Sequence, residues 1–109
     1  MNHLYGSFSE NQIQEYKVKL HKELFWLLLY KDPKTIDEYL NVDFDKYFVG
    51  VMKKINGFND LIFNPVEIVS IMSLLQAAYR ETKNVNFNWG QYRKLILDAH
   101  NLVDKIKEN

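Results

Sequence analysis

The chain has no cysteine, only four glycines and two prolines, and no net charge. The absence of cysteine excludes a disulfide framework and any thiolate metal site. The balance of 14 basic against 14 acidic residues removes the general attraction that draws proteins to nucleic acid or anionic membranes. A chain of 109 residues is long enough for one domain that buries roughly 65% of its unfolded surface.

The sequence also lacks a long hydrophobic run. The longest is Leu24–Tyr30, which is far shorter than the roughly 20 apolar residues of a membrane-spanning helix. The chain does not begin with a basic and then apolar leader followed by a small-residue cleavage site. We therefore expect a cytoplasmic protein with no membrane segment. The chain is rich in Asn, Ile, Tyr and Phe, and its basic residues are mostly Lys and not Arg. This usage is typical of an AT-rich bacterial or phage genome.

One local pattern recurs, in which an aromatic residue precedes Ser or Asn, two spacers, Gln or Glu, and an apolar residue. Its copies are Phe8–Ile13, Phe63–Ile68 and Phe87–Tyr92, and Val42–Tyr47 is a looser copy with Lys in the Gln or Glu position. The short polar side chain caps free backbone N–H groups, and the residues on either side close over the turn. The pattern therefore predicts four helix starts.

Hydrophobic spacing of three and four residues supports these starts. It predicts long helices over residues 10–31, 44–55, 65–83 and 89–107. Asp32-Pro33 should end the first helix and begin a short helical segment that reaches Leu40, and Asn56-Gly57 should end the second. Residues 1–8 read as a flexible tail. The sequence thus predicts one all-α domain over residues 1–109, a four-helix bundle with one additional short helical segment between helices 1 and 2.

Two regions carry more apolar residues than one buried helix face requires. The third helix is apolar nearly all round, so it is either the central helix or part of a homodimer or partner interface. At the end of the first helix, the aromatic residues are either covered by the short segment or exposed for binding. The candidate partner-binding residues are Phe25, Trp26, Leu29, Tyr30, Ile71 and Leu74.

Acidic residues crowd the stretch after the first helix. Asp37, Glu38, Asp43 and Asp45 form a candidate acidic patch. Such a patch would dock on a basic partner, or its members are helix caps and solvated side chains.

The sequence lacks the patterns of common catalytic and metal sites. No Glu is followed by His three residues later, and the zinc-protease motif and phosphate-binding glycine loops are missing. We expect no metal and no cofactor, and the lack of a basic recognition helix makes nucleic acid an improbable partner. His100 and Asp104 lie four residues apart, which allows an orienting hydrogen bond or half of a weak metal site.

Arg93 and His100 lie seven residues apart and therefore on nearly the same side of the last helix. In this spacing the chain resembles helical HEPN-type ribonucleases, which carry an Arg, four to six intervening residues and a His. The resemblance implies that His100 would act on the ribose hydroxyl or leaving group and that Arg93 would steady the phosphate, usually across a dimer. The chain departs from the family in having Lys94 where a polar residue such as Asn is usual.

The sequence therefore favours a non-enzymatic α-helical interaction or regulatory protein that occupies a protein partner's surface, with a homodimer as one option. Immunity, anti-defence and antitoxin-like proteins of bacteria or phages are of this kind. The alternatives are a HEPN-like ribonuclease that uses Arg93 and His100, or a small-molecule sensor with an aromatic pocket.

Overall fold

The computed structural model describes residues 2–3, 6–7, 10–59 and 66–106, with side-chain environments for residues 14–57 and 66–106. Four long helices, a short 3-10 helix and two two-residue strands follow one another along the chain. Their bounds are β1 (Asn2–His3), β2 (Gly6–Ser7), α1 (Glu10–Leu29), η1 (Ile36–Tyr39), α2 (Phe44–Asn59), α3 (Val66–Thr82) and α4 (Trp89–Val103). This order confirms the predicted all-α bundle with a short extra helix between its first and second long helices.

The two short strands lie in the stretch predicted as a tail. They pair in antiparallel fashion, with Asn2 opposite Ser7 and His3 opposite Gly6. The remaining residues of that stretch, 1, 4–5 and 8, lie outside the described residues, as do Ser9 and residues 60–65, which hold two of the predicted helix caps and most of the predicted apolar link.

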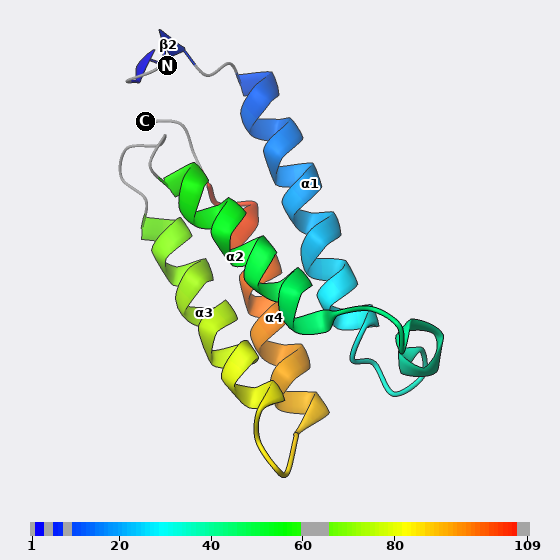
Figure 1. Cartoon of the computed structure of the whole chain (residues 1–109). Helices are drawn as coiled ribbons and strands as arrows, with labels where there is room; N and C mark the ends of the chain where they lie inside the picture. Colours follow the sequence, from blue (N-terminus) through cyan, green and yellow to red (C-terminus); the bar gives the residue numbers. More distant parts are fainter. Residues whose placement is uncertain (1, 4–5, 8–9, 60–65, 107–109) are drawn as a thin grey trace.

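The four long helices run alternately up and down the bundle (Figure 1). Helix α4 packs against both α1 and α3, and α2 packs against α3. Helix η1 lies to one side, beyond the end of α1 (Figure 1). The core consists of side chains with no more than 2% exposure, contributed by all four helices and by the turn after α4: Leu20, Leu24, Leu27, Phe48, Val51, Ile55, Ile68, Ile71, Leu75, Ala78, Tyr92, Ile96, Ala99, Val103 and Ile106.

Every carbonyl of the last turn of α1 has a hydrogen-bond donor. The carbonyl of Trp26 accepts from the Tyr30 N–H at 3.0 Å, and that of Leu28 accepts from the Asp32 N–H at 2.9 Å. The Tyr92 hydroxyl of α4 donates to Leu27 O at 2.8 Å, and Thr35 Oγ1 donates to Leu29 O at 2.7 Å. Because helix ends leave four carbonyls without intrahelical partners, these bonds fix the end of α1 firmly in the bundle.

The predicted stop of the second helix at Asn56-Gly57 is wrong, because α2 continues to Asn59. A Cβ at Gly57 would meet nothing within 4 Å, so this glycine takes part in no close approach. Glycine after a helical pattern favours an end but does not impose one, and it is tolerated inside a helix at a cost of about 1 kcal/mol.

The predicted cap of α4 is confirmed at its central bond. The Asn88 side chain accepts a hydrogen bond from the backbone N–H of Gln91 at 3.0 Å. The ring of Phe87, just before the cap, lies 5.7 Å from that of Tyr92, which closes the turn as a hydrophobic staple. The looser copy at α2 also caps, since Asp43 Oδ1 accepts from the Lys46 N–H at 3.1 Å.

Candidate functional site

Helix η1 folds back against the aromatic end of α1. The ring of Tyr39 lies 5.2 Å from that of Tyr30 and 5.8 Å from that of Trp26, and both contacts are edge-on. Tyr30 also stacks on Trp26 at 5.6 Å and meets Tyr47 of α2 edge-on at 5.2 Å. The short segment therefore covers Tyr30, which is half-buried, as one of the two sequence interpretations expected.

The cover is incomplete. Phe25 remains 53% exposed and Trp26 39%, whereas core residues of the same helix, such as Leu24, have no exposed surface. Leu29 is half-buried and contributes its carbonyl to the Thr35 hydrogen bond. Phe25 and Trp26 thus form an exposed aromatic pair on the last turns of α1.

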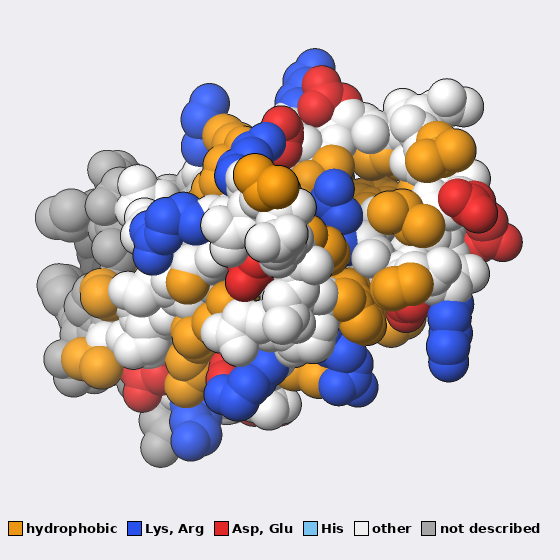
Figure 2. Space-filling model, turned by 90° about the horizontal axis from the view of Figure 1, so that it is seen from below, with side chains coloured by type: hydrophobic (Ala, Val, Ile, Leu, Met, Phe, Trp, Pro, Cys, Tyr) orange, Lys and Arg blue, Asp and Glu red, His pale blue; other side chains and the backbone are white. Residues whose placement is uncertain are grey.

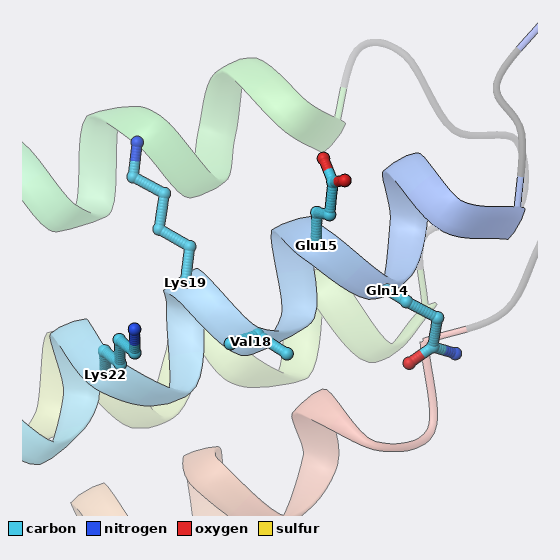
Figure 3. Close-up of a pocket in the computed structure, with 5 residues that line it drawn as sticks. All are labelled: Gln14, Glu15, Val18, Lys19 and Lys22. Atoms are coloured by element: carbon cyan, nitrogen blue, oxygen red, sulfur yellow. The ribbon is translucent and has the colours of Figure 1, made fainter.

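Two hollows lie along α1, and the second of them also borders α4. The first is lined by Gln14, Glu15, Val18, Lys19 and Lys22. Their side chains come from successive turns of the helix (Figure 3). The second is lined by His21, Lys22, Phe25, Trp26 and His100. Because Lys22 lines both, the hollows adjoin, and we call the two together the α1 groove.

A histidine pair lies where α1 meets α4. The ring centroids of His21 and His100 are 4.0 Å apart, and His21 Nε2 lies 2.9 Å from Asp104 Oδ1. The Nδ1 atom of His21 is buried without a hydrogen-bond partner among the described residues. Sequence spacing had paired Asp104 with His100, but the carboxylate instead bonds to a histidine on another helix. Helical periodicity within α4 carries no signal for His21, because the two residues are 83 positions apart.

The charges at this junction follow from its geometry. The hydrogen bond from His21 lowers the pKa of Asp104 below its usual value, so the carboxylate is ionised at neutral pH. Partial burial, together with the neighbouring His21, lowers the pKa of His100, although Asp104 opposes this shift. His100 is therefore neutral at pH 7. Lys17 Nζ also approaches the backbone carbonyl of Asp104, at 3.4 Å.

The geometry gives little support for acid–base chemistry by two histidines around a phosphate. With ring centroids 4.0 Å apart, His21 and His100 touch, so no substrate atom fits between them. Arg93 lies exposed on α4. Among the described residues no group of three or more His, Asp or Glu side chains could hold a metal ion.

The outward-facing side of α3 is more polar than the composition of this helix indicated. Ile71 has no exposed surface and Leu74 is half-buried against the core, so within the single chain Ile71 offers nothing to a partner. The exposed apolar residues of α3 are Val66 and Val69, at 64% and 55%. The positions that face outward further along are Ser73, Gln76 and Arg80.

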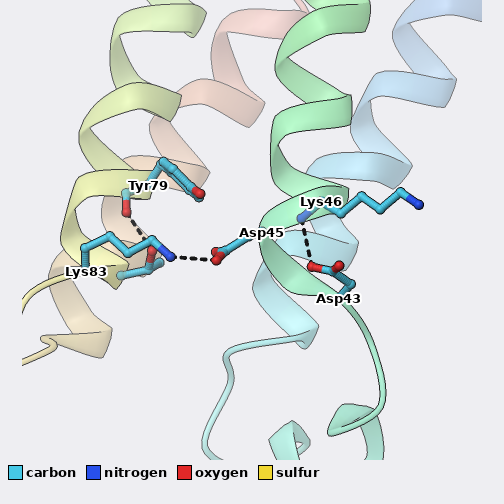
Figure 4. A network of polar contacts seen from close by, with 6 residues as sticks. Asp43, Asp45, Lys46, Tyr79 and Lys83 are labelled. Carbon is cyan, nitrogen blue, oxygen red and sulfur yellow. Dashed lines mark hydrogen bonds and ion pairs between the residues drawn. The ribbon is translucent and has the colours of Figure 1, made fainter.

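The candidate acidic patch divides into two parts. Asp43 caps α2, and Asp45 forms an ion pair of 2.7 Å with Lys83 of α3 (Figure 4). That ion pair lowers the pKa of Asp45 and raises the pKa of Lys83. Asp37 and Glu38 lie exposed in η1. The structure therefore assigns two of the four carboxylates to stabilising contacts within the chain.

Comparison with known protein families, curated proteins and solved structures gave no match to this chain. Within the described residues, none of the helices combines the length and the hydrophobicity needed to cross a bilayer.

Proposed function

We propose that this protein binds a protein partner through the aromatic pair Phe25 and Trp26 on α1 and catalyses no reaction. One observation carries the proposal. Phe25 is 53% and Trp26 39% exposed, although η1 folds back over the adjoining ring of Tyr30. Large rings left in water cost free energy, and Trp and Tyr are enriched among the residues that contribute most to binding.

The surroundings of the pair support a binding role. The hollow lined by Phe25 and Trp26 is also lined by Lys22 and two histidines, and on the face seen in Figure 2 hydrophobic side chains lie among charged ones. A mixed surface of this kind suits a partner that associates and dissociates more than a permanently buried subunit contact. The last turn of α1 is held by four hydrogen-bonded carbonyls, so the rings sit on a rigid support and lose little entropy on binding.

The biological setting is part of the same proposal. The chain is a short, neutral, helical single domain, and its amino-acid usage is typical of an AT-rich genome. These properties fit a bacterial or phage regulator that blocks a partner's surface. Immunity, anti-defence and antitoxin-like proteins act in this way.

Photocrosslinking tests the proposal directly. A benzophenone amino acid placed at position 25 should crosslink one discrete protein in lysate of a low-GC bacterium. The same amino acid at position 69 of α3 is a matched control, because Val69 is exposed to the same degree, 55% against 53% for Phe25. Crosslinking that is equal at both positions, or absent at both, would contradict the proposal.

A HEPN-like ribonuclease that uses Arg93 and His100 is the second candidate. Its support is that Arg93 is exposed on α4 and that His100, neutral at pH 7, lines the α1 groove beside Lys22, where a base and a cation could meet a phosphate. Under our leading proposal the purified protein cleaves no RNA. Cleavage that is lost in His100→Ala, with an unchanged circular dichroism spectrum, would favour the ribonuclease instead.

A further inference from the structure

The two hollows of the α1 groove follow one another over three turns of helix. Its two hollows share Lys22, and their lining residues on α1 extend from Gln14 to Trp26. At 1.5 Å per residue this stretch is about 18 Å long, which matches about three turns of a second helix lying along α1.

The lining of the groove combines apolar surface with positive charge. Val18 is 54% and Phe25 53% exposed, and they lie seven residues apart, on the same side of the helix. Lys22 stands between them, and Lys19 is exposed one turn earlier. Among the described lining residues Glu15 is the acidic one, and it lies one turn before Lys19. Lys19 and Lys22 against Glu15 leave this lining with one net positive charge.

The charges nearby on the other elements do not cancel Lys22. Glu23 of α1 bonds to Lys54 of α2 at 2.8 Å. The carboxylate of Asp104, the residue after α4, bonds to His21, and Lys17 adds a further cation beside its backbone. Among the described residues, the carboxylates of Glu23 and Asp104 therefore already have cationic or imidazole partners.

We infer that the α1 groove binds an acidic amphipathic helix of a protein partner, and this inference rests on the proposed function. Apolar side chains of that helix lie on Val18, Phe25 and Trp26, and its carboxylates meet Lys22. A second copy of this chain fits poorly, because a two-fold interface brings the same surface against itself. That surface has a net positive charge among its described lining residues, so it offers Lys22 no surplus of carboxylates.

Two designed helical peptides test this inference. Both carry the same Leu and Trp face over about 18 residues. One has Glu and the other Lys beside that face. Fluorescence anisotropy should show the acidic peptide binding at least about fivefold more tightly than the basic one, because charge pairs at a partly exposed interface contribute up to about 1 kcal/mol each.

Charge reversal locates the contact. Lys22→Glu should weaken the acidic peptide about fivefold to twentyfold, since it replaces one attraction by one repulsion. Arg80→Glu is the matched control, because Arg80 is exposed on α3 and the change in net charge is the same. It should alter binding less than about twofold. Phe25→Ala should weaken both peptides.

The inference is overturned if the basic peptide binds as well as the acidic one, if neither binds, or if both charge reversals have equal effects. It is also overturned if light scattering shows a dimer that Lys22→Glu strengthens, because the groove would then hold a second copy. Crosslinking at position 25 with no peptide binding would keep the proposed function and reject the acidic helix. Peptide binding without crosslinking would contradict the proposed function and, with it, the partner helix, although the surface would still select acidic peptides.

Discussion

Tyr92→Phe tests how the aromatic surface is held in place. Tyr92 is fully buried, and its hydroxyl donates to the carbonyl of Leu27, across the boundary between α4 and α1. Burial raises the pKa of Tyr92 well above its usual value, so the hydroxyl stays protonated and remains a donor at any working pH. The change to Phe keeps the ring and removes only this donor.

The loss leaves a buried carbonyl without its partner. An unsatisfied buried acceptor costs about 1–3 kcal/mol, more than the net value of an average hydrogen bond. For a domain of this size about 1 kcal/mol lowers the melting temperature by about 4–8 °C. We therefore expect Tyr92→Phe to melt at least about 4 °C below the parent in a calorimetric scan.

Tyr39→Phe is the matched control, because its ring is half-buried in the aromatic cluster and it loses the same group. It should change stability by less than about 0.5 kcal/mol. A melting temperature for Tyr92→Phe within about 1 °C of the parent would refute the reasoning, because the Leu27 carbonyl would then have another donor or lie open to water.

Two further changes probe other parts of the fold. Asn88→Ala removes the side-chain acceptor of the Gln91 N–H and should cost about 1 kcal/mol in urea unfolding, whereas an unchanged midpoint would mean that the cap is dispensable. His100 has a lowered pKa in the folded state, so the unfolded chain binds its proton more readily. The stability that neutral His100 provides is therefore complete above the unfolded pKa of about 6.5 and is lost as the pH falls toward the lower folded value. Thermal melts should show a smaller loss between about pH 7.5 and about pH 5.5 in His100→Gln than in the parent, and parallel curves would contradict this.

Local chemistry made much of the fold readable from the sequence. The starts of α2 at Phe44 and of α4 at Trp89 follow from cap residues, α3 starts at Val66, one residue after the predicted start, and α1 ends at Leu29, shortly before Asp32-Pro33. These signals act over a few residues and depend on backbone geometry alone. Asn56-Gly57 misled because packing of Ile55 in the core and continued helical hydrogen bonding outweigh the weak preference of glycine for an end.

The candidate site was only partly readable. Sequence reasoning picked out Phe25 and Trp26 as surplus to one buried face, and both are exposed. It also proposed Ile71 as a partner-binding residue, because the sequence of a helix that is apolar nearly all round does not reveal which side faces the core. The helix itself turns Ile71 inward and leaves Ser73 and Gln76 outside.

By itself, the sequence determined the helical class and the number of long helices, since these depend on local preference and composition. Only the tertiary structure decided which distant groups meet. It brought His21 to Asp104, Tyr92 to the carbonyl of Leu27 and Tyr39 to the ring of Tyr30. Such contacts depend on the packing order of the helices, which follows from the sum of many core contacts and leaves no short pattern in the chain.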